Sequence, residues 1–156
     1  MDNDCRGYKR FADPLTVQGT RVWKKALRCH PYYTYTQALD LCWKWYDGLN
    51  WVNAKAFCPE EDSRLIVLDT YTKLNAVRNH LVSSGDAVFY FIGGHKQQGT
   101  WVWLNGKPVD MSPSFWGPGE PSGQSFAIYL AWNLDFHGRF DDSGGFVDTR
   151  YICEKP

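Results

Sequence analysis

The stretch WVNAKAFC, residues 51–58, decides the fold of this chain. Trp51, Ala54 and Cys58 are spaced at i, i+3 and i+7, so they fall on one face of a helix. Pro59 follows at once and helps to end that helix. The stretch therefore predicts a short helix that carries a tryptophan and a cysteine on a single face.

Outward from this helix, the apolar pattern predicts strands and a second helix. Residues 32–46 are rich in Tyr and Trp and predict β structure around a turn. Residues 65–68 are continuously apolar and predict a short strand. The second helix takes Thr70 or Thr72 as its N-cap and ends near Ser84. Its apolar face consists of Leu74, Val77 and Leu81.

The helical period disappears after residue 86. Residues 87–92 predict a buried strand closed by Gly93-Gly94. Asn105-Gly106 is a strong signal for a two-residue hairpin turn. Residues 126–132 and 147–153 predict the last two strands.

A long loop rich in Gly, Pro and Ser spans residues 111–125 (MSPSFWGPGEPSGQS). A loop of this length inside a compact domain is usually functional or disordered. Its aromatic anchors, Phe115 and Trp116, favour a functional loop.

Composition narrows the class of protein. The formal net charge is zero, which disfavours nucleic acid and anionic membranes as partners. No apolar run approaches the roughly 18 residues that span a bilayer, so membrane insertion is not expected. With 8 Trp, 9 Tyr and 9 Phe, the chain suits a compact, loop-rich fold with large packing units.

The five cysteines are Cys5, Cys29, Cys42, Cys58 and Cys153, and none forms a C-x-x-C pair. This pattern disfavours a zinc site and fits a secreted protein from an oxidising compartment, with one thiol left over if two bridges form. The start of the chain is polar where a signal peptide would be apolar, and we interpret it as a mature chain with an added Met. The alternative is a cytosolic protein with five reduced cysteines.

Seven short motifs follow one another within residues 29–155. They are Trp51-x-x-Ala54-x-x-x-Cys58, Phe91-Ile92-Gly93-Gly94, Trp101-x-Trp103-x-Asn105-Gly106, Trp116, Glu120-Pro121-Ser122, Phe140-Asp141-Asp142 and Tyr151-Ile152-Cys153-Glu154. Each is weak alone, but in this order they resemble the C-type lectin-like domain in its long form with an N-terminal hairpin. The resemblance implies an α+β fold, with two helices packed on small antiparallel sheets and a long ligand loop.

The resemblance also implies how the cysteines pair. Cys58 would join Cys153, and Cys29 would join Cys42 within the N-terminal hairpin. Cys5 then remains, either as an interchain disulfide of a homodimer or as a free thiol. Residues 1–28 would form an arm with a candidate role in oligomerisation, and residues 29–156 the domain.

Another implication is that the family's second internal bridge is missing. Its two expected positions hold Ala127 and Gly145. Both partners are replaced together, so no unpaired thiol remains near the ligand loop.

In calcium-dependent members of that family, one Ca²⁺ is held by a Glu-Pro-Asn loop with a cis Glu-Pro bond and by a later Asn-Asp pair. Two sugar hydroxyls complete its shell. The matching positions here are Glu120, Ser122, Asp141 and Asp142. Ser122 replaces an amide, Asp141 replaces an Asn, and the acid expected between the motifs is absent. Three carboxylates remain, and carboxylate oxygens are ligands that Ca²⁺ takes. A second calcium site is not expected.

Simpler interpretations of the same residues stay open. Asp141 and Asp142 precede Ser143-Gly144 and are compatible with a solvated turn. Glu120 alone is compatible with an ordinary surface carboxylate. Phe136 and His137 lie in the short loop that would face the ion, where an aromatic ring could stack on a sugar or merely pack.

The resemblance favours a secreted lectin that recognises glycans on microbial or host-cell surfaces through one calcium ion, with a role in innate immunity. The alternative is a calcium-independent lectin-like domain that binds protein, lipid or mineral. An enzyme is not expected. A glycosidase could pair Glu120 with Asp141 or Asp142, but no apolar neighbour in the sequence would raise one pKa, and no nucleophile motif appears.

Overall fold

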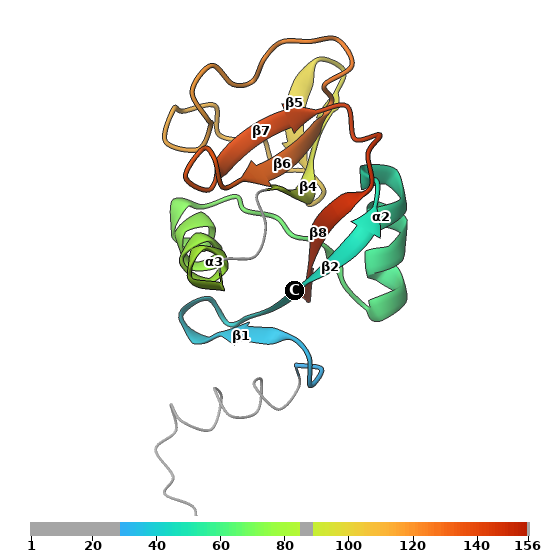
Figure 1. Cartoon of the computed structure of the whole chain (residues 1–156), viewed down its shortest axis with the longest axis vertical. Helices are drawn as coiled ribbons and strands as arrows, with labels where there is room; N and C mark the ends of the chain where they lie inside the picture. Colours follow the sequence, from blue (N-terminus) through green and yellow to red (C-terminus); the bar gives the residue numbers. More distant parts are fainter. Residues whose placement is uncertain (1–28, 85–88, 156) are drawn as a thin grey trace, which may run out of the picture.

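The computed structural model describes residues 29–84 and 89–155 of the 156-residue chain (Figure 1). The predictions for Cys5 and for the arm over residues 1–28 lie outside the described residues. No helix in the described ranges is both long and apolar enough to cross a bilayer.

The described strands form one mixed sheet (Figure 1). They are β1 (Thr34–Thr36), β2 (Leu41–Leu49), β3 (Arg64–Leu65), β4 (Phe89–Gln97), β5 (Thr100–Trp103), β6 (Tyr129–Asn133), β7 (Arg139–Ser143) and β8 (Thr149–Lys155). The order is β1-β2-β8-β4-β6-β7, with β3 on β8 and β5 on β4. Neighbours are antiparallel except β4 and β8, which are parallel. The predicted α+β class is confirmed, with one mixed sheet in place of small antiparallel ones.

Within residues 29–84 and 89–155, two α-helices accompany the sheet, as predicted. Helix α2 (Trp51–Phe57) is capped by Asn50, whose side chain accepts a hydrogen bond from the Asn53 amide. Trp51 and Ala54 are buried on its inner face. Helix α3 (Tyr71–Ser84) begins after Thr70, whose hydroxyl accepts from the Lys73 amide. Short 3₁₀ turns, η1 (Gln37–Leu39) and η2 (Cys58–Glu61), follow β1 and α2.

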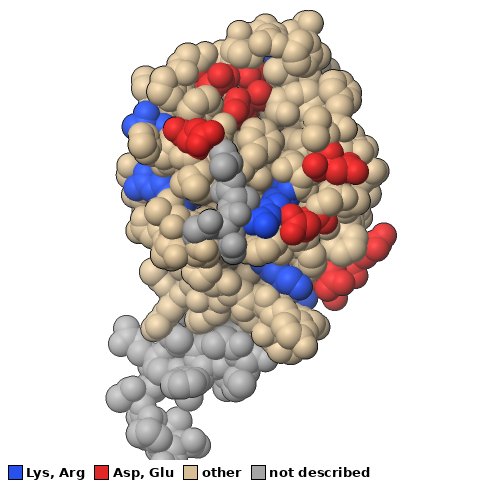
Figure 2. Space-filling model, in the orientation of Figure 1, with Lys and Arg blue, Asp and Glu red and all other residues tan. Residues whose placement is uncertain are grey.

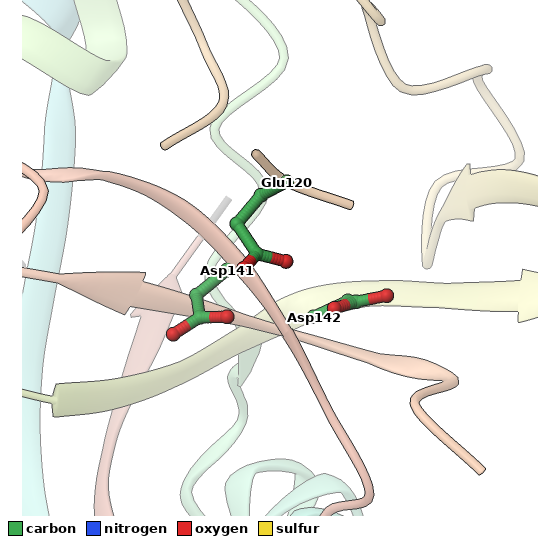
Figure 3. A group of neighbouring side chains, drawn as sticks. All are labelled: Glu120, Asp141 and Asp142. Atoms are coloured by element: carbon green, nitrogen blue, oxygen red, sulfur yellow. The ribbon is translucent and has the colours of Figure 1, made fainter. Parts of the chain in front are cut away.

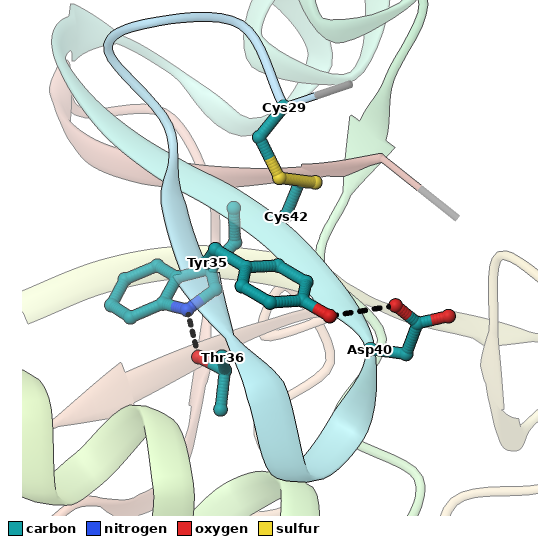
Figure 4. Close-up of a disulfide and its surroundings, with 6 residues drawn as sticks. Cys29, Tyr35, Thr36, Asp40 and Cys42 are labelled. Carbon is teal, nitrogen blue, oxygen red and sulfur yellow. Dashed lines mark hydrogen bonds between the residues drawn. A yellow bond between two sulfur atoms is a disulfide. The ribbon is translucent and has the colours of Figure 1, made fainter. Parts of the chain in front are cut away.

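Both implied disulfides are present. Cys58 at the end of α2 bonds to Cys153 in β8, across 95 residues of sequence. Cys29 bonds to Cys42 and closes the N-terminal hairpin, where the Tyr35 hydroxyl also donates to Asp40 at 3.0 Å (Figure 4). The long bridge therefore joins a helix to the middle of the sheet, and the short one fixes the chain's entry into it.

A buried carboxylate lies beside the long bridge. Glu154 is fully buried and accepts hydrogen bonds from Arg64, Lys73 and the backbone amide of Val67. Since Arg64 belongs to β3 and Lys73 to α3, this one side chain of β8 ties three elements together.

Two glycines lie inside β4 and do not close it, so the predicted end of this strand is wrong. A Cβ on Gly93 would stand 2.6 Å from the carbonyl oxygen of Leu65, and one on Gly94 would stand 2.2 Å from Leu130. The pairing with β6 shifts register between Phe91 and His95, so the strand passes the glycines through an irregularity and continues. Glycine is needed here for close backbone approach.

The hairpin between β4 and β5 turns at Gln98-Gly99, which the sequence reading did not identify. Both residues have positive φ, 49° and 81°, as a type I′ turn requires. The chain also reverses at the predicted Asn105-Gly106, but through a three-residue loop and not the two-residue turn that was predicted. The Trp103 amide donates to the Lys107 carbonyl, the Gly106 amide donates to the Trp103 carbonyl, and only Gly106 of the pair has positive φ.

Three other predicted strands differ in extent. In the run 65–68, only Leu65 belongs to a strand. The Ile66 amide still donates to the Ile152 carbonyl of β8, but the Val67 amide donates to the Glu154 side chain and not to a strand backbone. Strand β6 begins at Tyr129, after a turn in which the Ala127 amide bonds to the Gln124 carbonyl. Strand β8 begins at Thr149 because Val147 is exposed and unpaired with the sheet.

Candidate functional site

The loop that carries Glu120 is fastened to β7. Trp116 is buried, and its indole N–H donates to the Asp110 carbonyl. The next amide, that of Gly117, donates to the Phe140 carbonyl of β7 at 2.9 Å. The Glu120 amide donates back to Gly117, and the Glu120-Pro121 peptide is cis. The loop therefore holds Glu120 against the strand that carries the two aspartates.

Asp141 and Asp142 lie within β7, so the solvated-turn interpretation is wrong. Asp141 pairs with Ala131 and Asp142 with Leu130 of β6. Asp142 is only 9% exposed. A strand places these carboxylates more rigidly than a turn would, because ladder hydrogen bonds fix the backbone on which they stand.

Glu120, Asp141 and Asp142 form one acid cluster (Figure 3). Each offers a carboxylate oxygen within 4.8 Å of the others. Asp142 Oδ1 accepts from the Ser122 amide at 3.0 Å, and Asp141 Oδ2 accepts from the Asn133 side chain at 2.9 Å. Glu120 Oε2 and Asp142 Oδ2 are buried and have no hydrogen-bond partner.

The cluster raises the pKa values of Glu120 and Asp141. Burial, together with the neighbouring carboxylates, raises the pKa of Glu120 to about 7. Burial and the charge of Asp142 also raise the pKa of Asp141, although the hydrogen bond from Asn133 opposes the shift. Three like charges and two unpartnered buried oxygens are costly without a cation. The residues therefore fit a hard divalent ion such as Ca²⁺.

Asn133 was missed by the sequence reading. It ends β6, is 8% exposed, and holds Asp141 with its amide nitrogen. Its side-chain oxygen accepts from the Asp135 amide, so both ends of the side chain are fixed. The available signal was a polar residue directly after the apolar run Leu130-Ala131-Trp132, at the end of a strand next to the acidic pair.

The other predicted site residues lie in different places. Ser122 is exposed and meets the cluster through its backbone amide, while its hydroxyl accepts from Gln124. The ring of Phe136 lies against Gly117, since a Cβ there would stand 2.3 Å from its Cδ2. His137 lines a hollow beside α3. The structure therefore brings Phe136 to the ligand loop and His137 to the helix.

Comparisons with known proteins identify the family of this domain. The family model described as the lectin C-type domain matches residues 47–155. The hepatic lectin of Gallus gallus is 30% identical over 123 residues, which cover 73% of this chain and 58% of that protein. The chain thus spans less than two thirds of that relative.

Solved structures show the same fold. The mouse scavenger receptor C-type lectin carbohydrate-recognition domain superposes with a TM-score of 0.69 at 24% identity, over 81% of this chain and 95% of that one. A Ca²⁺-independent C-type lectin from Saxidomus purpuratus also gives 0.69, at 22% identity over 81% and 93% of the two chains.

Proposed function

The chain belongs to the C-type lectin domain family, a family of non-enzymatic binding domains, and from that premise we propose that it binds carbohydrate through one calcium ion. The ion would be held by Glu120, Asp141 and Asp142, with Ser122 beside it on the cis-Pro loop. The supporting observation is the pair of buried oxygens, Glu120 Oε2 and Asp142 Oδ2, which have no partner in a cluster of three acids.

Each residue of the cluster has a distinct task in this proposal. Glu120 and Asp142 supply their unpartnered oxygens as ligands. Asp141 adds a third ligand oxygen and also accepts hydrogen bonds from sugar hydroxyls, because a carboxylate is an acceptor only. Asn133 is a positioning residue that holds Asp141. When bound, Ca²⁺ offers coordination positions to two neighbouring hydroxyls of the sugar.

The aromatic residues of the 134–138 loop are further proposed contacts. Phe136 lies beside the loop that carries Glu120, so its ring could stack on the apolar face of a pyranose. His137 would contact a ligand only if that ligand extended toward α3, because His137 lies with α3 residues. Asp141 stands where calcium-dependent members have an Asn, so the site lacks one side-chain N–H donor for a sugar oxygen. This favours a sugar whose hydroxyl groups donate hydrogen bonds to the site more than they accept them.

A calcium-independent lectin-like domain that binds protein, lipid or mineral is the second candidate. It is favoured by two hydrogen bonds that the protein itself donates to carboxylates of the cluster, since these bonds satisfy oxygens without a cation. Asn133 donates to Asp141 and the Ser122 amide donates to Asp142. Ser122 also lacks the side-chain amide that calcium-dependent members use. Chelation separates the two candidates.

The decisive experiment is a glycan array screened with Ca²⁺ and again with EDTA. Binding that is lost in EDTA supports the calcium site, and binding that survives EDTA supports the second candidate. Glu120→Gln should abolish the calcium-dependent signal. Asp148→Asn is the matched control, because it neutralises an exposed acid outside the cluster.

The setting proposed for this activity is extracellular. The disulfides Cys29–Cys42 and Cys58–Cys153 are typical of extracellular or membrane-anchored proteins. The proposed partners are glycans of microbial or host-cell surfaces. A homodimer linked through Cys5 is proposed with them, and non-reducing electrophoresis of Cys5→Ser beside the parent chain tests it.

A further inference from the structure

A second hollow lies away from the acid cluster. It has a volume of about 510 Å³ and lies between the C-terminal half of α3 and the loop that joins β6 to β7. Its lining residues are Arg78, Asn79, Val82, Ser83, Leu134 and His137. None of them belongs to the acid cluster, and none of these described lining residues carries a carboxylate.

Arg78 is held at this hollow by packing of its stem. A Cβ on Gly138 would stand 2.6 Å from Arg78 Cγ, 2.7 Å from its Cδ and 2.8 Å from Trp132 Cζ2. Gly138 also has a left-handed φ of 71°, so the close approach depends on glycine at this position. An arginine whose stem is already packed loses little further freedom when it binds a ligand.

The guanidinium of Arg78 has no acidic partner in the described ranges. The ion pairs found there use Arg64, Lys73, Lys107 and Arg150, and no carboxylate oxygen of the described residues lies within 4.0 Å of an Arg78 nitrogen. Charges of both signs are otherwise interspersed on the face shown in Figure 2. An unpaired guanidinium offers a planar fork of donors that matches a carboxylate.

The other lining residues complement such a ligand. Asn79 and His137 supply polar side chains, while Val82 and Leu134 supply an apolar wall. His137 holds its position with a left-handed backbone, φ 55°, and its amide donates to the Leu134 carbonyl. One arginine, further polar groups and an apolar wall suit a small carboxylic acid that also has hydroxyl groups and an apolar edge.

We infer that this hollow is a calcium-independent subsite for an acidic sugar, with the sugar carboxylate on Arg78 and its ring against Val82 and Leu134. The inference that Arg78 binds a carboxylate depends only on the residues that line the hollow. The choice of a sugar acid rests on the proposed function. The two sites adjoin the same short loop, since Phe136 lies against Gly117 of the ligand loop while His137 lines the hollow.

An amide NMR titration of the whole chain in EDTA tests this subsite. Methyl glucuronide should give saturable shifts at Leu134 and Gly138, whereas methyl glucoside, its neutral counterpart, should not. Equal shifts from both sugars would overturn the carboxylate assignment. Equal binding of cyclohexanecarboxylate would leave the carboxylate assignment in place and overturn the sugar.

Variants separate this subsite from the calcium site and from misfolding. Arg78→Gln keeps Cγ and Cδ, and hence the packing on Gly138, but should weaken glucuronide binding on the order of tenfold through loss of a charge-assisted pair. His137→Asn should weaken it less, because Asn tolerates left-handed backbone. EDTA keeps the calcium site empty in this comparison, and Asp148→Asn, which neutralises an exposed acid outside the cluster, should bind glucuronide as the parent does. Unchanged affinity in a folded Arg78→Gln would refute the inference.

Discussion

Asp142→Asn should change the stability of the domain in opposite directions without and with calcium. Asp142 Oδ1 accepts from the Ser122 amide, and an Asn oxygen can keep that bond. The new NH₂ would replace Oδ2, which has no partner, and would offer a donor to the unpartnered Glu120 Oε2. Without calcium, the change therefore removes a like charge and satisfies a buried acceptor.

The magnitude follows from the spacing of the cluster. Two unit charges about 4.8 Å apart repel by roughly 3–4 kcal/mol at an effective dielectric constant of about 20. At pH 8 Glu120 is mostly charged, because its pKa is raised only to about 7, so most of this repulsion is present in the parent. Solvent at the partly exposed Asp141 screens part of it. We therefore expect the variant to be more stable than the parent in EDTA by about 1 kcal/mol at pH 8.

Calcium should reverse this order. A site filled at 100 times its dissociation constant stabilises the parent by about 2.7 kcal/mol. At roughly 4 °C per kcal/mol for a domain of this size, that is a rise of about 10 °C in melting temperature. The variant has lost a charged ligand, so most of this rise should disappear.

Thermal unfolding, followed by circular dichroism, gives the melting temperature of each protein with and without calcium. Parent and variant are melted in EDTA and in saturating CaCl₂, with Asp148→Asn as the control for a simple change of charge. A variant that melts below the parent in EDTA would refute the repulsion argument. A variant that keeps the parent's calcium shift would refute the role of Asp142 as a ligand.

Three further predictions concern other parts of the domain. Replacing Cys58 and Cys153 together by Ala should cost about 4 kcal/mol in denaturant unfolding, because the bridge closes a loop of 95 residues. Gly93→Ala should destabilise by about 1–3 kcal/mol in the same assay, since its Cβ would lie 2.6 Å from the rigid Leu65 carbonyl oxygen; no change would contradict the close approach. In EDTA, the melting temperature should fall as pH rises from about 4.5 to about 7. The pKa of Glu120 is higher in the folded state than its ordinary value, so its contribution is fully present below that window and lost above it; a rise over the window would contradict the sign.

Local patterns predicted the helices well because each carries a short-range signal. The spacing of Trp51, Ala54 and Cys58 gave the face of α2 that the structure buries. Of the two predicted N-cap residues, Thr70 and Thr72, it is Thr70 whose hydroxyl caps the start of α3. The disulfide pairing has no such local signal, and only the order of motifs along the chain indicated it.

Features set by contacts distant in sequence were harder to predict. Gly93-Gly94 read as the end of a strand, but the glycines serve close approach to Leu65 and Leu130 from other parts of the chain. Gln98-Gly99 forms the hairpin turn although Gln is not a usual residue for its first position.

The acid cluster shows the same limit. Its three carboxylates could be selected from the sequence by their motifs, but their proximity depends on the loop bonds to Phe140. Asn133 was missed because its task depends on the pairing of β6 with β7, which places it across from Arg139 and close to Asp141. Registers of this kind are set by packing and not by residue type alone.

The pairing of Cys42 with Lys155 across β2 and β8 determines where further polypeptide would join the domain. Cys29 is bonded to Cys42, so the first and last described segments leave the domain side by side. Strand β7, which carries the acidic pair, lies in the upper part of Figure 1, away from β1 and the end of the chain. Polypeptide joined at either end would therefore leave the proposed calcium site facing outward. In an assembly of several copies, that polypeptide would set the spacing of the sites, and with it the gain from binding many sugars at once.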